Sequence, residues 1–321
     1  MKAPFGISCQ NFLEDFVKHF WENRYKRGDS SHIMLQEDLL KMKKINLPVA
    51  AFFAAALFST GSSQAAVVFG SGANAAAIQA DVDAFRALLG ANNGVGGSFA
   101  SGRREINWDG VPDSFSSPNN LPANFFNSNS PRGVVFSTAG SGFAVSADSS
   151  NPTATATNFV NLNAGYAGLF QNFSAERLFT SLGSNVMQVD FFVPGTNTPA
   201  AVFGFGAVFA DVNIAGGTQI SLFFSDGSFG GAFAVPTSGV GGLSFLGVTS
   251  TDARRYSRVV ITSGNTVIGA NQNLTANADV VVMDDFIYGE PIATVPEPSS
   301  IMLMSGGLLG FAAMLRKRRS S

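Results

Sequence analysis

The sequence predicts a mainly β protein, an antiparallel β-sandwich of the jelly-roll type, with one helix before it and one membrane helix behind it. Short runs of strand-forming residues alternate with turn residues from residue 133 to residue 288. Phe203, Phe205 and Phe209 share one face of an expected strand, as in strands with one face in a core. The pair Asp226-Gly227 separates two apolar runs and predicts a tight hairpin over residues 218–236.

The first element of the predicted domain is a helix over residues 74–89. Its apolar residues Ile78, Val82, Phe85 and Leu89 share one helical face, and Gly90 follows as a stop signal. Residues 94–130 are rich in Gly, Pro, Asn and Ser and are expected to form loops. Strands are then expected at residues 133–137, 143–147, 186–193, 201–211, 219–225, 231–235, 243–248, 257–262 and 280–288.

A secretory signal precedes this domain. Met42-Lys43-Lys44 forms a basic start, Ile45–Phe58 is largely apolar, and Ser63-Gln64-Ala65 fits a small-x-small cleavage site. We therefore expect signal peptidase to cleave between Ala65 and Ala66.

The 41 residues upstream of the signal allow two interpretations. Either Met42 is the true start and residues 1–41 are a mis-assigned extension, or residues 1–41 are a cytoplasmic segment that makes the apolar run a membrane anchor. Fourteen helical residues rise about 21 Å, which is short of a hydrocarbon core of roughly 30 Å. This length favours the first interpretation.

The other end of the chain carries a three-part signal. An extended joint, Val295–Ser300, leads into the apolar run Ile301–Leu315, which is followed by the basic cluster Arg316, Lys317, Arg318 and Arg319. This order predicts a short membrane helix whose basic end stays on the cytoplasmic side. An ordinary C-terminal anchor is the alternative, although fifteen apolar residues are few for a permanent span.

This tail resembles the PEP-CTERM sorting signal of Gram-negative bacteria, which is the substrate tag of exosortases. The resemblance rests on Pro296, Glu297 and Pro298, on the apolar run and on the basic end. It implies transient anchoring in the inner membrane, removal of the tail by an exosortase, and delivery to the cell surface or the extracellular polysaccharide matrix. The predicted organisation is an extension (1–41), a signal peptide (42–65), an exported domain (66–294) and a sorting signal (295–321).

The exported region lacks the residues that most catalytic sites need. No Lys occurs between Ile45 and Arg316, and Cys9, His19 and His32 all precede the region. Disulfides, His-based nucleophilic sites, the usual zinc, copper and haem sites, and Lys Schiff bases are therefore not expected. Residues 66–294 hold eight Arg against fifteen Asp and Glu, a net charge of −7, which disfavours nucleic acid as a partner.

Asp284 and Asp285 are the candidate metal-binding residues. They lie in an apolar segment (residues 280–287) that is expected to be a central strand, so at least one carboxylate should be buried and need a partner. Adjacent strand residues point to opposite faces, so the two are not expected to act as one pair. The partners considered are Arg254, Arg255 and Arg258, or a structural Ca²⁺ ion. No other cofactor is predicted.

Three functions remain open. The leading hypothesis is a structural or adhesive protein of the surface or matrix, without enzymatic activity. The alternative is a carbohydrate-binding module, with exopolysaccharide as its partner and Trp108 as the candidate contact, since sugars stack on Trp. The third is a carboxylate-only glycoside hydrolase, which requires two acids in one cleft. The candidates for that cleft are Asp109, Asp113, Asp211 and Glu290.

Overall fold

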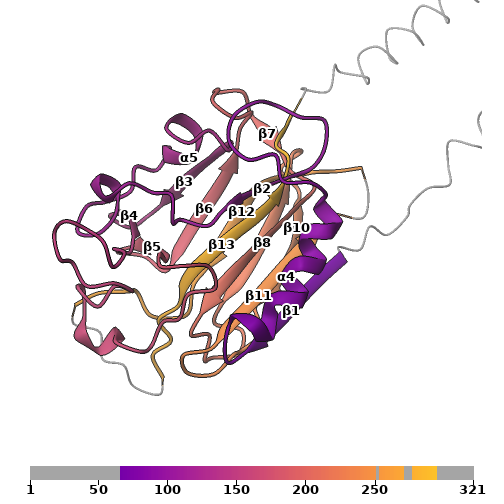
Figure 1. Ribbon diagram of the computed structural model, residues 1–321. Coiled ribbons are helices and arrows are strands. Elements are labelled where there is room, and N and C mark those ends of the chain that lie inside the picture. Colours follow the sequence, from indigo (N-terminus) through magenta and orange to yellow (C-terminus); the bar gives the residue numbers. More distant parts are fainter. Residues whose placement is uncertain (1–65, 251–252, 271–276, 295–321) are drawn as a thin grey trace, which may run out of the picture. The chain divides into compact units, whose positions relative to one another are not determined.

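The computed structural model describes residues 66–250, 253–270 and 277–294 (Figure 1). The predicted signal peptide, the segment upstream of it and the sorting tail from Val295 onward lie outside the described residues.

The larger sheet has seven strands, all paired antiparallel. Its order is β1-β11-β8-β13-β5-β4, and β2 pairs with one end of β13. The strands are β1 (Ala66–Gly72), β2 (Arg103–Ile106), β4 (Gly142–Val145), β5 (Phe179–Leu182), β8 (Gly204–Ala210), β11 (Leu243–Thr249) and β13 (Val282–Gly289).

The second sheet has five antiparallel strands in the order β10-β9-β12-β6-β3. These are β3 (Val134–Thr138), β6 (Val186–Phe191), β9 (Gln219–Phe224), β10 (Phe229–Ala234) and β12 (Tyr256–Thr262). Two short strands, β7 (Ala200–Ala201) and β14 (Ile292–Ala293), pair with each other and form a separate two-stranded sheet.

The helix α4 (Ala75–Leu89) forms where the apolar spacing predicts it. The side chain of Asn74 accepts a hydrogen bond from the backbone N–H of Ala77, which satisfies a free donor of the first turn. Figure 1 shows α4 lying over the larger sheet near β1 and β11. A short second helix, α5 (Phe125–Ser128), lies in the loop-rich region before β3.

Two hydrophobic cores hold the domain together. The first draws side chains from both sheets and is dominated by aromatic rings, among them Phe136, Phe205 and Phe209. The second combines Ile78, Phe85 and the rest of the apolar face of α4 with the opposite face of the larger sheet. The central strands of the larger sheet are therefore buried on both faces, and every residue of β8, β11 and β13 is buried.

The close contact between α4 and its sheet depends on glycine. A Cβ atom at Gly247 would lie 2.5 Å from the ring of Phe85, closer than real Cβ atoms approach other heavy atoms. The missing side chain lets the helix approach the sheet backbone closely.

The mainly β, antiparallel prediction is confirmed, and so are the single long helix and the hairpin. In the hairpin, β9 and β10 are joined through Asp226-Gly227, with Gly227 at φ +81° and the Asp226 carboxylate accepting a hydrogen bond from the Ser228 N–H at 2.8 Å. The strands β1, β2, β5 and β14 lie outside the predicted ranges, and the single strand expected at residues 201–211 is divided into β7 and β8. In the ranges that the structure describes, no helix is long and apolar enough to cross a bilayer.

Candidate functional site

The two candidate aspartates lie at a β-bulge in β13. Met283 pairs with Phe209 of β8, but Phe286 pairs with Ala207, so Asp284 and Asp285 together face the single residue Val208. The extra residue shifts the alternation of the strand. Met283 and Phe286 consequently both reach the core between the sheets, although they are three positions apart.

The bulge brings the two carboxylates together, so the prediction that they point to opposite faces is wrong. The hydroxyl of Ser174 lies 2.7 Å from Asp285 Oδ1 and 3.2 Å from Asp284 Oδ1. Asp284 Oδ2 accepts hydrogen bonds from the backbone N–H groups of Phe173 at 2.6 Å and Ser174 at 3.3 Å. The carboxylates thereby hold the loop around Ser174 against the larger sheet.

The ion-pair partner of Asp285 comes from α4. Arg86 Nη2 lies 3.2 Å from Asp285 Oδ2 and 3.0 Å from Glu105 Oε2, and Arg86 Nη1 lies 3.1 Å from Asp83 Oδ1. Arg103 adds a second cation, 2.6 Å from Glu105 Oε1. An arginine partner is thus present, although it was expected from a different part of the chain.

The arginines that the sequence suggested as partners lie elsewhere. Arg258 pairs with Asp190 across two strands of the smaller sheet at 3.4 Å, and Arg254 lies 3.8 Å over the ring of Phe224. No local sequence pattern indicates that Arg86 is the partner of Asp285, because the two residues are 199 positions apart and meet only when α4 packs on the sheet.

Burial dominates the electrostatics of the acid pair. Loss of solvent raises the pKa of Asp284 well above its ordinary value, and the neighbouring Asp285 carboxylate raises it further. Burial also raises the pKa of Asp285, against the opposing effects of the Ser174 hydroxyl and Arg86. Nearby, burial raises the pKa of Asp109 to about 6, and the charge of Asp285 contributes.

Trp108 contacts the backbone of the bulge from inside the core. Its indole N–H donates to the backbone carbonyl of Asp284 at 2.8 Å, and its ring stacks on Phe179 with centroids 3.9 Å apart. Phe126 and Phe286 meet the indole edge-on. Only 1% of the residue is exposed, so the prediction that Trp108 contacts a glycan is wrong. The residues next to Trp108 in the sequence are polar, which suggested a surface position, although the whole ring lies in the core.

Protein groups already surround the acid pair. Within residues 66–250, 253–270 and 277–294, no group of three or more His, Cys, Asp or Glu side chains could hold a metal ion. The carboxylate oxygens instead accept from N–H, O–H and guanidinium donors. Calcium binding was predicted because a buried charge needs a partner. Protein groups fill that role here, and calcium binding stays a prediction.

The four acids considered for a hydrolytic cleft each contact groups of the domain itself. Asp109 and Asp113 both contact Arg177, through its backbone N–H at 3.1 Å and its Nη2 at 2.6 Å. Glu290 forms a buried pair with Arg104, with both contacts at 2.7 Å. Asp211 accepts a hydrogen bond from the N–H of Gly241 at 2.7 Å. Each carboxylate thus has a local structural partner.

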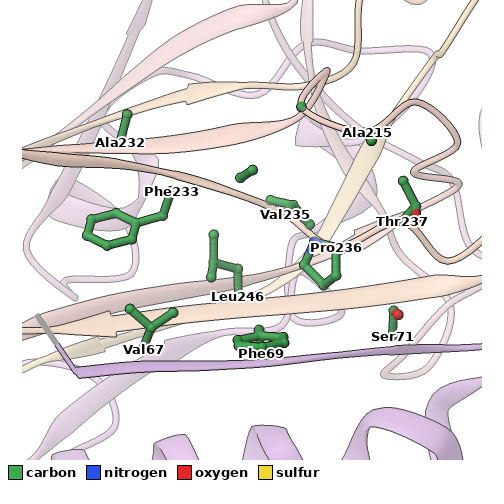
Figure 2. A pocket seen from close by; sticks show the side chains of 12 residues that line it. Val67, Phe69, Ser71, Ala215, Ala232, Phe233, Val235, Pro236, Thr237 and Leu246 are labelled. Carbon is green, nitrogen blue, oxygen red and sulfur yellow. The ribbon is translucent and has the colours of Figure 1, made fainter.

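A groove of about 730 Å³ lies elsewhere, between β1 and β10. Figure 2 shows Val67 and Phe69 on one wall, Phe233 and Val235 on the other, and Leu246 between them. No charged side chain lines the groove. The sequence does not reveal this groove, because β1 carries no clear strand pattern and the walls come from strands that are distant in the chain.

The described residues form a mainly β, antiparallel domain. The sequence that follows this domain indicates how the protein is sorted. Residues 294–319 match the family model of the PEP-CTERM protein-sorting motif, so the chain carries an exosortase sorting signal, which indicates export and sorting to the cell surface. No curated protein and no solved structure matches the chain.

Proposed function

We propose that the protein is a structural or adhesive component of the cell surface or the extracellular polysaccharide matrix, and that it acts without catalysis. The observation that carries the proposal is the sorting motif over residues 294–319, with Pro296, Glu297 and Pro298 at its start. A protein tagged in this way is processed by an exosortase during export. The domain that precedes the tag then functions outside the cell.

The proposed route has three steps. Signal peptidase cleaves between Ala65 and Ala66, and the apolar run Ile301–Leu315 holds the protein transiently in the inner membrane. The basic cluster Arg316–Arg319 keeps the end of the chain in the cytoplasm. An exosortase then removes the tail and leaves the two-sheet domain, which we assign to the jelly-roll sandwiches, at the surface or in the matrix.

The absence of catalysis is supported by how the acids are used. The buried carboxylates of Asp284, Asp285 and Glu290 accept hydrogen bonds or form ion pairs inside the domain. Acid–base catalysis by two carboxylates needs both groups facing one substrate cleft. The apolar groove between β1 and β10 contains no carboxylate. A carbohydrate-binding function loses its main support because Trp108 is inside the core.

The sorting step is tested by replacing Pro296, Glu297 and Pro298 together with Ala in the full chain, expressed in an exosortase-containing host. The triple variant is expected to stay in the membrane fraction with its tail attached, whereas the wild type is processed and released. The control replaces Ser320 and Ser321, which lie just beyond the matched residues, with Ala. Release of the triple variant at the wild-type level would refute exosortase sorting.

The molecular role is tested on the same cells. Deletion of the gene is expected to weaken cell cohesion or matrix retention, and the wild-type chain is expected to restore it. N-terminal sequencing of the released protein should give Ala66. A hydrolytic activity toward the isolated matrix polysaccharide would overturn the non-catalytic assignment.

A further inference from the structure

Two sheet edges lie open on the same side of the domain. Among the described strands, β1 ends the larger sheet and β10 ends the smaller one, and neither has a partner on its outer side. Residues of both strands line the groove in Figure 2, so the two edges lie next to each other. Unpaired edges carry free backbone donors and acceptors that can bind another strand.

The groove is the open end of the core between the sheets. In β1, Val67 pairs with Val248 and Phe69 with Leu246, and both partners belong to that core. From the other sheet, Phe233 packs against the same core. Phe69 nevertheless remains 62% exposed and Val67 39% exposed. Along this side, the apolar core is not covered by the described chain.

Neither edge strand is protected by a charged side chain or a proline; β10 has an irregularity between Phe229 and Gly231, whereas β1 pairs with β11 without interruption. The β1 sequence, AVVFGSG, and the β10 sequence, FGGAFA, contain no charged residue and no proline. Natural edge strands are usually protected by charges, especially Lys, or by proline. Residues 66–294 have a net charge of −7, but neither edge strand contributes a charged side chain to it, so no two like-charged side chains of these strands would face each other across a contact between copies.

We propose that this face binds a second copy of the chain, with β1 pairing antiparallel to β1 of the other copy about a two-fold axis at Phe69. Phe69 is the middle residue of the seven-residue strand, so the two-fold brings the two Phe69 residues together and keeps all seven residues in register. The larger sheets become continuous, and the open ends of the two cores cover each other. A two-fold interface requires a self-complementary surface, and a neutral apolar edge meets that requirement. The inference does not depend on the proposed matrix role.

The first test measures the mass of the exported protein, isolated from cells that express the full chain, by light scattering at micromolar concentrations. The wild type is expected to be a dimer. Phe69→Lys places two ammonium groups against each other in an apolar interface and should weaken dimerisation about 100-fold or more. Val95→Lys is the matched control, because Val95 is 53% exposed but does not line the groove. Circular dichroism and the melting temperature show whether each variant is folded.

The second test uses disulfide trapping. The chain has a single cysteine, Cys9, so a Cys9→Ser background removes every native thiol. In that background Phe69→Cys should give a disulfide-linked dimer on a non-reducing gel, and Val95→Cys should stay monomeric. A monomeric wild type, a folded Phe69→Lys variant that still dimerises, or a dimeric Phe69→Cys variant that does not cross-link would each overturn the proposal. A monomer that retains an unrelated peptide in the groove would also overturn it.

Discussion

Replacing Arg86 with Met removes the cation that joins α4 to the bulge of β13. Arg86 contacts Asp285, Glu105 and Asp83, and its own side chain is only 20% exposed, while that of Asp285 is 3% exposed. Removing one partner from a buried ion pair costs about 3–5 kcal/mol, because the other charge stays buried. Since Arg86 keeps some contact with water, we expect a loss of about 3 kcal/mol, which corresponds to roughly 6–12 °C in melting temperature for a domain of this size.

The assay is urea unfolding of the exported wild-type and variant proteins at pH 7, followed by circular dichroism. Arg258→Met is the matched control, because Arg258 is 51% exposed and its pair with Asp190 is 3.4 Å long. Exposed pairs contribute about 0–1 kcal/mol. Adding Asp285→Asn to Arg86→Met removes the stranded charge and should recover part of the lost stability. If Arg86→Met costs no more than Arg258→Met, or if the two changes at Arg86 and Asp285 are simply additive, the argument for a buried electrostatic link is refuted.

Three further predictions concern buried polar groups. Burial raises the pKa of Asp211 to about 6, so the folded protein binds this proton more tightly than the unfolded chain, and the free energy of unfolding should fall as the pH rises toward 6. Asp211→Asn suits the residue's φ of +70° and should remove that part of the slope, stabilising the protein by about 1–2 kcal/mol at pH 8 in urea titrations; an unchanged slope would contradict this. Trp108→Phe loses the indole N–H bond to Asp284 and leaves a cavity, so it should lower stability by about 2–4 kcal/mol in the same assay, and a loss below 1 kcal/mol would argue against the packing described. If calcium binds at the bulge, calorimetric titration with millimolar Ca²⁺ should give heat that Asp285→Ala abolishes, whereas no heat from the wild type ends the calcium hypothesis.

Periodicity was enough to predict the elements with a strong local signal. The helix from Ala75 to Leu89 has a complete apolar face, and the hairpin at Asp226-Gly227 has a turn pair that needs little tertiary support. The strand β1 was missed because its few residues follow directly on the predicted signal peptide. The strand β5 was missed because it is four residues long and its pattern, Phe-Thr-Ser-Leu, is only partly apolar.

The candidate site was predicted less well, for a physical reason. The sequence indicated that at least one of the Asp284 and Asp285 carboxylates would be buried and would need a partner, and both statements hold. The bulge that turns the two carboxylates toward Ser174 depends on the register between β13 and β8, which no local pattern encodes. Trp108 and Arg86 likewise find their partners only through long-range packing.

The distribution of basic residues also determines how the exported domain responds to proteases and to chemical labels. Without Lys from residue 45 to residue 316, a trypsin-like protease can cut residues 66–294 only after arginine. Arg104 and Arg177 are buried, and Arg86, Arg103, Arg132 and Arg255 are partly buried. Arg258 is exposed but lies within β12, which is paired on both sides, so the exposed Arg254 before β12 is the most accessible cleavage site. Such a domain offers few accessible sites to a trypsin-like protease, and its residues 66–294 offer no lysine amine for chemical coupling.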